Sequence, residues 1–180
     1  MATTQTIKRP AVFVDRDGTV MEEVHYCREP DKVRLFPGVS DALKALKAAG
    51  FYVILVTNQS GIARGSISLP EYEAVHSRLL ELLGPEILDA TYMCPDGPTE
   101  PSLRRKPAPG MLLEAAEEWQ IDLATSWMIG DKPVDIECAE RAGVGSILVR
   151  TGYGATVTNT TANHVAQDLA GAVSWILAQR

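Results

Sequence analysis

The sequence predicts an α/β fold, in which helices cover both faces of a doubly wound parallel sheet. Two observations lead to this prediction. Short apolar runs alternate with segments whose apolar residues recur at helical spacing, over most of the 180 residues. Uninterrupted apolar runs such as AVFV at 11–14 are typical of strands buried on both faces. Because a helix joins each strand to the next, we expect the strands to be parallel.

The first half of the chain contains two predicted strand–helix pairs. The strand at 11–14 is followed by a polar stretch at 21–36, whose Glu-Pro and Phe-Pro-Gly sequences predict a loop or small hairpin. Apolar residues at helical spacing predict a helix over 39–49, which a glycine ends. A second buried strand is predicted at 51–56. A helix over 70–83 then begins with a proline and ends before Gly-Pro.

The second half continues the alternation. A strand is predicted at 87–93, and the Pro- and Gly-rich stretch 94–109 is predicted to be a loop. The remaining predicted elements are a helix at 110–119, a strand at 126–129, a helix at 134–142, a strand at 146–149, a loop around 152–154 and a closing helix at 165–178.

Composition narrows the class of protein. With 46% apolar residues, the chain can fill the core of a single domain, and its net charge of −6 disfavours general binding to nucleic acid or anionic membranes. Its three cysteines are widely spaced and suggest no disulfide framework. The N-terminal MATTQTIKRP lacks the apolar core of a signal peptide, and no apolar run is long enough to span a bilayer. We therefore expect a cytoplasmic protein, and a monomer.

Polar residues follow the predicted strands at three places, namely Asp15 and Asp17, Thr57 and Asn58, and Asp131. The carboxyl ends of parallel strands share one edge of a sheet, so these residues are expected to converge. Lys106, from the loop after the third strand, can reach the same edge. A hard cation such as Mg²⁺ prefers a set of oxygen ligands like this one, and the lysine suits an anionic oxygen beside it. The set predicts a site for phosphoryl transfer.

Four motifs carry a resemblance to a known family. DRDGT at 15–19, TNQSG at 57–61, RKPAPGM at 105–111 and GDKPVD at 130–135 resemble the signature motifs of the haloacid dehalogenase-like (HAD) phosphatases. The longer sequences LVTNQSGIARG, RKPAPGML and VRTG resemble the branch that holds heptose-bisphosphate 7-phosphatases and histidinol-phosphate phosphatases. The resemblance covers about residues 10–155. It implies a Rossmann-like, HAD-like fold, with residues 1–180 forming one domain, and a hydrolase of carbohydrate metabolism.

The resemblance also implies catalytic and metal-binding roles. Asp15 matches the nucleophile, which becomes an aspartyl phosphate, and Asp17 matches the general acid and base. Thr57 would donate a hydrogen bond to a phosphoryl oxygen, and Lys106 would stabilise the charge of nucleophile and phosphoryl group. Mg²⁺ would be held by the Asp15 side chain, the Asp17 backbone carbonyl and Asp131.

Substrate contacts are implied for a larger set of residues: Glu23, His25, Tyr26, Thr57, Asn58, Gln59, Ser60, Arg105, Lys106 and Lys132. Arg105 matches the residue that recognises the rest of the substrate. A solvated lysine at the start of a helix is an equally good interpretation of Lys132, and His25 by itself resembles a surface residue. Glu-Val-His-Tyr at 23–26 departs from the Asp-His-Gly-Tyr-like pattern of the heptose phosphatases. The resemblance therefore does not fix which substrate groups this loop contacts. Asp135 is expected to orient Lys106 or a metal-bound water.

Spacing indicates an enzyme without a cap domain. Roughly 40 residues separate Asp17 from Thr57, and somewhat under 50 separate Asn58 from Lys106, which leaves no room for a domain of typical size. Water then has access to the site, which disfavours a phosphotransferase or mutase. A silent binding module is disfavoured because both aspartates are present. The expected substrate is D-glycero-D-manno-heptose 1,7-bisphosphate, with histidinol phosphate or another small sugar or polyol phosphate as the alternative.

The clearest departure from the related branch lies at 94–104. Relatives hold a structural zinc there through a Cys-x-His pair and a Cys-x-Cys pair. This chain keeps Cys94, but the other three positions hold Asp96, Ser102 and Arg104. Structural zinc requires four closed ligands, which this set cannot supply, so we expect no structural zinc. The prolines of the loop could restrict it instead, by lowering the entropy of the unfolded chain.

Overall fold

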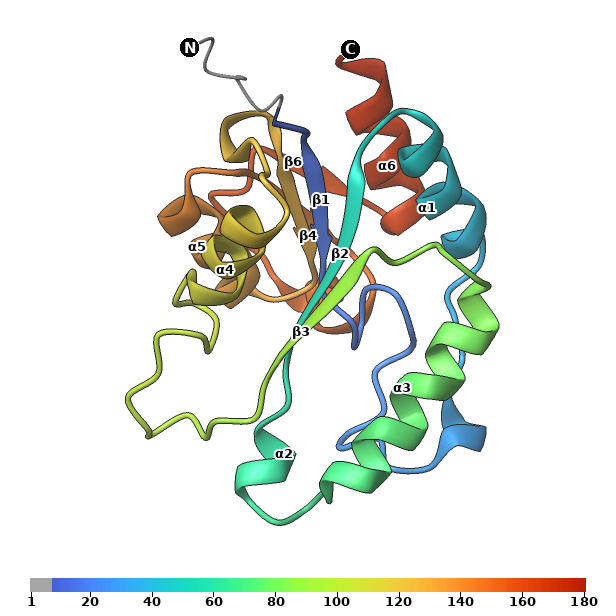
Figure 1. Ribbon diagram of the computed structural model, residues 1–180, viewed down its shortest axis with the longest axis vertical. Helices are drawn as coiled ribbons and strands as arrows, with labels where there is room; N and C mark the ends of the chain where they lie inside the picture. Colours follow the sequence, from blue (N-terminus) through green and yellow to red (C-terminus); the bar gives the residue numbers. More distant parts are fainter. Residues whose placement is uncertain (1–7) are drawn as a thin grey trace, which may run out of the picture.

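A six-stranded parallel sheet forms the centre of the molecule (Figure 1). We describe residues 8–180 of a computed structural model; residues 1–7, which hold most of the segment in which we predict no signal peptide, lie outside the described residues. The strands are β1 (Ala11–Val14), β2 (Tyr52–Asn58), β3 (Ala90–Cys94), β4 (Trp127–Gly130), β5 (Gly145–Val149) and β6 (His164–Ala166).

The strand order is β3-β2-β1-β4-β5-β6, and every neighbouring pair is parallel. The order reverses between β1 and β4, which is where a doubly wound sheet leaves a crevice at the carboxyl ends of its strands. Val14 at the end of β1 pairs with Leu55 on one side and Ile129 on the other. The predicted fold class is confirmed.

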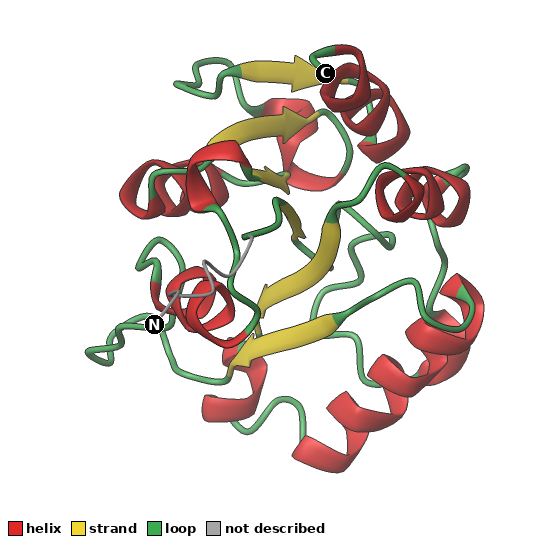
Figure 2. Cartoon of the chain, turned by 45° about the horizontal axis from the view of Figure 1, so that its top comes forward, coloured by secondary structure: helices red, strands yellow, loops and turns green. Residues whose placement is uncertain are grey.

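Helices cover both faces of the sheet (Figure 2). One face carries α1 (Val39–Ala48), α3 (Leu69–Leu83) and α6 (Leu169–Ala178), and the other carries α4 (Gly110–Glu118) and α5 (Pro133–Ala142). Successive side chains of β1 point to opposite faces of the sheet and so belong to two different hydrophobic cores. Val12 and Val14 pack with the first group of helices, whereas Ala11 and Phe13 pack with the second. All four side chains are fully buried, as an uninterrupted apolar strand predicts.

Short elements complete the connections. They are α2 (Ser60–Ala63), directly after β2, and the 3₁₀ helices η1 (Pro30–Lys32), η2 (Leu123–Thr125) and η3 (Gly152–Thr156). The polar stretch after β1 closes as a small hairpin, in which Met21 and Leu35 form an antiparallel bridge and the Glu22 N–H donates to the Arg34 carbonyl at 2.8 Å. The α2 and α3 helices join β2 to β3.

The end of the chain differs from the prediction. His164–Ala166 forms the edge strand β6, and the closing helix begins at Leu169 instead of residue 165. The strand was missed because it is short and its apolar residues continue into the apolar pattern of the helix. Asp168 marks the true start, because its side chain accepts a hydrogen bond from the Gly171 N–H at 2.8 Å. The third strand also begins later than predicted, at Ala90.

Two further expectations concern cysteines and membranes. The sequence suggests no disulfide framework, and all three cysteines are buried, free thiols in the structure. In residues 8–180, no helix combines the length and the apolar character needed to cross a bilayer.

Candidate active site

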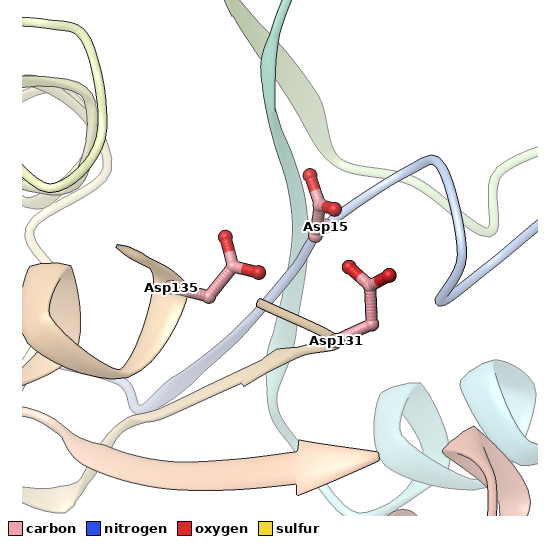
Figure 3. A group of neighbouring side chains, drawn as sticks. All are labelled: Asp15, Asp131 and Asp135. Carbon is pink, nitrogen blue, oxygen red and sulfur yellow. The ribbon is translucent and has the colours of Figure 1, made fainter. Parts of the chain in front are cut away.

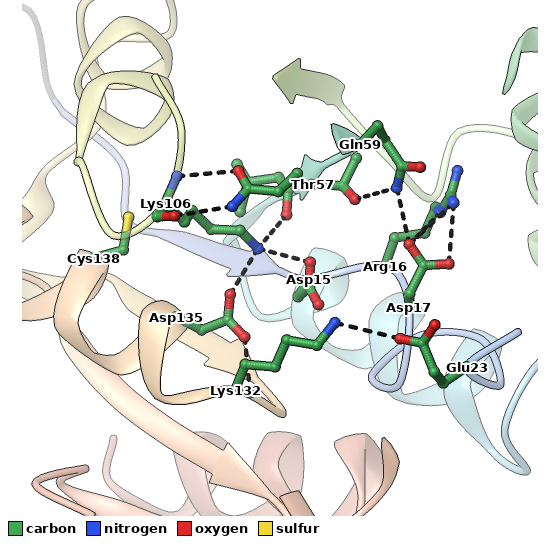
Figure 4. Close-up of polar contacts among 12 residues, drawn as sticks. Asp15, Arg16, Asp17, Glu23, Thr57, Gln59, Lys106, Lys132, Asp135 and Cys138 are labelled. Carbon is green, nitrogen blue, oxygen red and sulfur yellow. Dashed lines mark hydrogen bonds and ion pairs between the residues drawn. The ribbon is translucent and has the colours of Figure 1, made fainter. Parts of the chain in front are cut away.

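The polar residues that follow the strands converge at one edge of the sheet (Figures 3 and 4). Asp15 follows β1, Thr57 lies near the end of β2, and Asp131 follows β4. Lys106 reaches them from the loop between β3 and α4, and Asp135 reaches them from the first turn of α5. All five are buried, which predicts strong interactions among the four that carry charge.

Lys106 is the central cation of the site. Its Nζ lies 2.7 Å from Oδ1 of Asp15 and 2.7 Å from Oδ1 of Asp135, and it donates to the Val56 carbonyl at 3.0 Å. Burial by itself lowers the pKa of Lys106, but the two carboxylates outweigh burial and raise the pKa above its ordinary value. Lys106 is therefore charged, and Asp135 lies where its carboxylate can orient the lysine side chain.

Asn58 fixes the backbone of Lys106. Its Nδ2 donates to the Lys106 carbonyl, and its Oδ1 accepts from the Lys106 N–H, both at 3.0 Å. Sequence reasoning placed Asn58 only against the substrate. The structure adds a contact that holds the lysine loop against the end of β2.

Three carboxylates lie close together at this edge, as Figure 3 shows. Asp15, Asp131 and Asp135 each offer an oxygen within 4.8 Å of the others. The Oδ1 of Asp131 is buried and has no hydrogen-bond partner among residues 8–180, whereas its Oδ2 accepts from the Tyr153 N–H at 2.8 Å. Burial, together with the charge of Asp15, raises the pKa of Asp131 to about 8. Such a set of buried oxygens fits a hard cation.

Two glycines shape the other side of Asp131. Gly18 and Gly152 both have positive φ angles, of 84° and 53°. A Cβ on Gly18 would lie 2.2 Å from Oδ2 of Asp131, and one on Gly152 would lie 2.3 Å from the same atom. The Thr151 hydroxyl donates to the Gly18 carbonyl at 2.6 Å, which ties the loop after β5 to the loop after β1. Sequence reasoning identified Gly152 only as part of a loop.

Asp17 has different surroundings from the other aspartates. Both of its oxygens accept from the guanidinium of Arg16, at 3.1 Å from Nε and 3.0 Å from Nη2. Gln59 Nε2 donates to Asp17 at 2.9 Å and to the Thr57 hydroxyl at 2.8 Å. Arg16 was not predicted as a site residue, because a pattern of two aspartates does not show where the intervening side chain points.

A cavity of about 200 Å³ opens beside Asp17. The predicted substrate residues that line it are Glu23, His25, Tyr26, Asn58, Gln59, Ser60 and Lys132. Lys132 is not freely solvated: its Nζ lies 3.3 Å from Glu23 and 4.7 Å from the centre of the Tyr153 ring. Arg105 does not line this cavity, and its Nη1 donates to the Asp96 carbonyl at 2.9 Å.

The loop after β3 is organised around Ser102. Its hydroxyl accepts from the backbone N–H groups of Arg104 at 3.2 Å and Arg105 at 3.0 Å. Cys94 Sγ lies 3.7 Å from the same hydroxyl and 3.4 Å from a carboxylate oxygen of Asp96. Burial raises the pKa of Cys94, which favours the neutral thiol.

Comparison with known proteins agrees with this geometry. A family model described as HAD-hyrolase-like matches residues 103–172. D-glycero-D-manno-heptose-1,7-bisphosphate 7-phosphatase from Thermosynechococcus vestitus is 42% identical, over 93% of this chain and 95% of its own. The chain belongs to this phosphatase family of HAD-like hydrolases. D-glycero-beta-D-manno-heptose-1,7-bisphosphate 7-phosphatase from Escherichia coli K12 is also 42% identical, over 79% of this chain and 80% of its own.

A solved structure of the same family has the same fold. The D,D-heptose 1,7-bisphosphate phosphatase from B. bronchiseptica, complexed with magnesium and phosphate, aligns with a TM-score of 0.86 and 33% identity. The alignment covers 95% of this chain and 99% of the other. The family resemblance predicted from the four motifs is confirmed.

Proposed function

We propose that this chain is a Mg²⁺-dependent phosphatase that hydrolyses D-glycero-D-manno-heptose 1,7-bisphosphate at its 7-phosphate. The observation that carries the proposal is the charge arrangement at the edge of the sheet. Lys106 pairs with Asp15 at 2.7 Å, and the unpartnered Oδ1 of Asp131 lies in the same buried carboxylate group. The substrate is proposed because relatives that are 42% identical are heptose-1,7-bisphosphate 7-phosphatases.

The first chemical step uses Asp15 and Asp17. A carboxylate oxygen of Asp15 attacks phosphorus, the ester P–O bond breaks, and an aspartyl phosphate forms. The leaving sugar oxygen takes a proton from Asp17. Lys106 and the Thr57 hydroxyl stabilise the charge on the phosphoryl oxygens, where electrostatic stabilisation contributes most of the catalysis.

The second step releases phosphate. Water attacks the phosphorus of the aspartyl phosphate, and Asp17 takes a proton from that water. The bond between phosphorus and the Asp15 oxygen breaks, which regenerates the carboxylate. Asp17 lines the cavity, so the same side chain is available in both steps.

The residues present fit a bound Mg²⁺. Asp15 and Asp131, with the backbone carbonyl of Asp17, would hold it, and Oδ1 of Asp131 offers a ligand atom that accepts no hydrogen bond from residues 8–180. When bound, Mg²⁺ neutralises charge on the phosphoryl group and on the acidic cluster. Asp135 keeps its contact with Lys106 in this arrangement.

The sugar would occupy the cavity beside Asp17. Glu23, His25, Tyr26, Ser60 and Lys132 line it, and the lysine can exchange Glu23 for an anionic or hydroxyl group of the substrate. The distal phosphate is the partner proposed for Arg105, which would have to leave the Asp96 carbonyl. We further propose that the protein acts as a single-domain monomer in cytoplasmic carbohydrate metabolism.

Steady-state turnover against a panel of phosphate esters tests the proposal. The panel contains both anomers of the heptose bisphosphate, histidinol phosphate and simple sugar monophosphates, each with Mg²⁺ and with a chelator. The highest kcat/KM is expected for a heptose bisphosphate, with turnover lost in the chelator. Preference for histidinol phosphate, or full turnover without metal, would contradict it.

A further inference from the structure

We infer that Arg16 is a positioning residue that, together with Gln59, holds the carboxylate of Asp17 in the orientation needed for proton transfer. The inference rests on the proposed function, because it assigns Asp17 the role of general acid and base. It concerns a side chain that lies within the DRDGT motif but has no role in the proposed mechanism.

Arg16 is buried to an unusual degree for a charged residue. Its exposed fraction is 1%, although arginine is rarely buried unless it is paired. The only carboxylate within ion-pair distance of it in residues 8–180 is that of Asp17, which it contacts through two N–H groups. Its guanidinium lies 5.5 Å from the centre of the Tyr72 ring on α3, and Nη1 has no hydrogen-bond partner within the described part of the chain.

This arrangement fixes the arginine and leaves the aspartate at the cavity. Both residues line the cavity beside them, but the Asp17 side chain is 14% exposed and the Arg16 side chain only 1%, so the carboxylate is the more accessible group of the pair. A planar guanidinium that binds two oxygens of one carboxylate sets the plane of that carboxylate as well as its position. Lysine has the same charge but cannot supply this fork.

Gln59 binds the same carboxylate. Its Nε2 donates to Oδ2 of Asp17, the oxygen that also accepts from Nε of Arg16. It also donates to the Thr57 hydroxyl, which ties Asp17 to the end of β2 (Figure 4). Three donated hydrogen bonds therefore orient one carboxylate, and its rotation about the side-chain bonds requires breaking them.

The role predicts a kinetic pattern that differs between the two chemical steps. With p-nitrophenyl phosphate the leaving group needs no proton, so transfer of the phosphoryl group to Asp15 proceeds without the acid. Hydrolysis of the aspartyl phosphate still needs Asp17 as base. Loss of Arg16 should therefore slow the second step selectively and cause the phosphorylated enzyme to accumulate.

Rapid-quench mass spectrometry of the full chain with Mg²⁺ tests this. Arg16→Met is expected to keep the rate of phosphorylation by p-nitrophenyl phosphate within a few-fold of wild type. It is expected to slow dephosphorylation by about 10- to 100-fold, within the range for general acid–base catalysis. Arg16→Lys should show the same defect, because the charge alone does not orient the carboxylate. Arg78→Met, which removes an exposed arginine from α3, is the control.

Two further measurements separate positioning from a structural effect. Asp17→Asn should show the same accumulation, and Arg16→Met combined with Asp17→Asn should dephosphorylate no more slowly than Asp17→Asn alone. Gln59→Met should also slow dephosphorylation selectively, but by less. It tests the positioning of Asp17 if Arg16→Met does not fold.

The contrary outcomes are distinct. Equal loss of both steps in Arg16→Met and Gln59→Met, or additive losses with Asp17→Asn, would overturn the role of Arg16 while leaving the phosphatase intact. Wild type that turns over without forming a phosphorylated Asp15 would overturn the proposed mechanism, and the inference with it.

Discussion

The Nζ of Lys106 lies 2.7 Å from Oδ1 of Asp15, although 91 residues separate them in the sequence. Asp15 is at the end of β1, and Lys106 enters from the loop after β3. A buried carboxylate normally loses its charge, but a buried ammonium at this distance favours the ionised form. The contact therefore places a positive charge directly beside the proposed nucleophile.

Asp15→Asn is expected to lower turnover by roughly 1,000-fold or more, as the loss of a nucleophile does in other enzymes. Asparagine keeps the shape and an oxygen that accepts from Lys106, so the melting temperature should change little by comparison. Asp41→Asn, on the exposed surface of α1, is the control. Wild-type turnover by the variant, with the asparagine shown to be intact by mass spectrometry, would refute Asp15 as nucleophile.

The parts of the fold that could be predicted are those that leave a pattern of apolar residues within a short segment of sequence. The alternation of strands and helices and the parallel sheet followed from apolar patterns. The edge strand β6 did not, because Val165 and Ala166 merge with the apolar helix that follows, and only pairing with β5 distinguishes them. Pairing between strands that are separated in the sequence forms only in the folded chain, so a local pattern cannot show it.

Site residues divide in the same way. Asp15, Thr57 and Asp131 were predictable because the ends of parallel strands share one edge. The contact of the Thr151 hydroxyl with Gly18, across 133 residues, has no counterpart in any local pattern. Arg16 lies between two predicted residues, but its proximity to the Tyr72 ring on α3, at 5.5 Å, joins segments that are far apart in the sequence.

Metal binding should depend on pH through Asp131. The pKa of this carboxyl is raised to about 8 by burial and by Asp15, well above the ordinary value of about 3.9. In chelator, the stability that its protonation provides is complete below about pH 4 and is lost as the pH rises toward 8. Mg²⁺ binds the ionised form, so Mg²⁺ should raise the melting temperature more at about pH 8 than at about pH 6.

Asp131→Asn isolates that effect. In chelator at about pH 8 the variant should melt about 2–8 °C above wild type, the shift for roughly 1–2 kcal/mol in a chain of this size. It should also lose the response to Mg²⁺. A control variant, Asp122→Asn, removes a partly exposed aspartate that caps η2. An Asp131→Asn protein that still responds to Mg²⁺ as wild type does would show that Asp131 is not a ligand.

Gly152→Ala should abolish this Mg²⁺ response. Its added Cβ would lie 2.3 Å from Oδ2 of Asp131 and 2.6 Å from the Gly18 Cα, so the carboxylate must move. Gly143→Ala is a matched control, since its φ is also positive, at 73°, but its Cβ meets nothing within 4 Å. Both variants should lose roughly 1–2 kcal/mol to backbone strain. Only Gly152→Ala should also lose at least about tenfold in turnover. Equal turnover in the two variants would contradict a role for the close approach.

Arg105 and Arg104 offer a comparison between neighbours. Arg105 is the residue proposed to bind the distal phosphate, whereas Arg104 pairs with Glu114 at 3.0 Å. Arg105→Ala should lower kcat/KM for the heptose bisphosphate by about 10- to 100-fold, the cost of one lost charge-assisted pair, and should affect a monophosphate much less. Arg104→Ala should affect both substrates little and equally. Equal losses for both substrates in Arg105→Ala would make Arg105 a general structural residue.

The loop after β3 should fold and function without zinc. At the positions where the family resemblance implies four zinc ligands, Cys94 is accompanied by a carboxylate, a hydroxyl and a guanidinium. The guanidinium offers no lone pair and repels a cation. The raised pKa of Cys94 also disfavours the thiolate that zinc requires. The Ser102 hydroxyl instead binds two backbone N–H groups of the loop.

Elemental analysis of protein purified without chelator should therefore find no stoichiometric zinc, and a zinc chelator should leave the melting temperature unchanged. Ser102→Ala removes an acceptor from two N–H groups, so it should lower the free energy of unfolding by about 1–2 kcal/mol. It should also weaken binding through Arg105, whose N–H is one of the two. Ser174→Ala, on the exposed face of α6, is the control for loss of a hydroxyl. Zinc bound through Cys94, with melting lowered by its removal, would show that the loop retains a metal site despite its altered ligands.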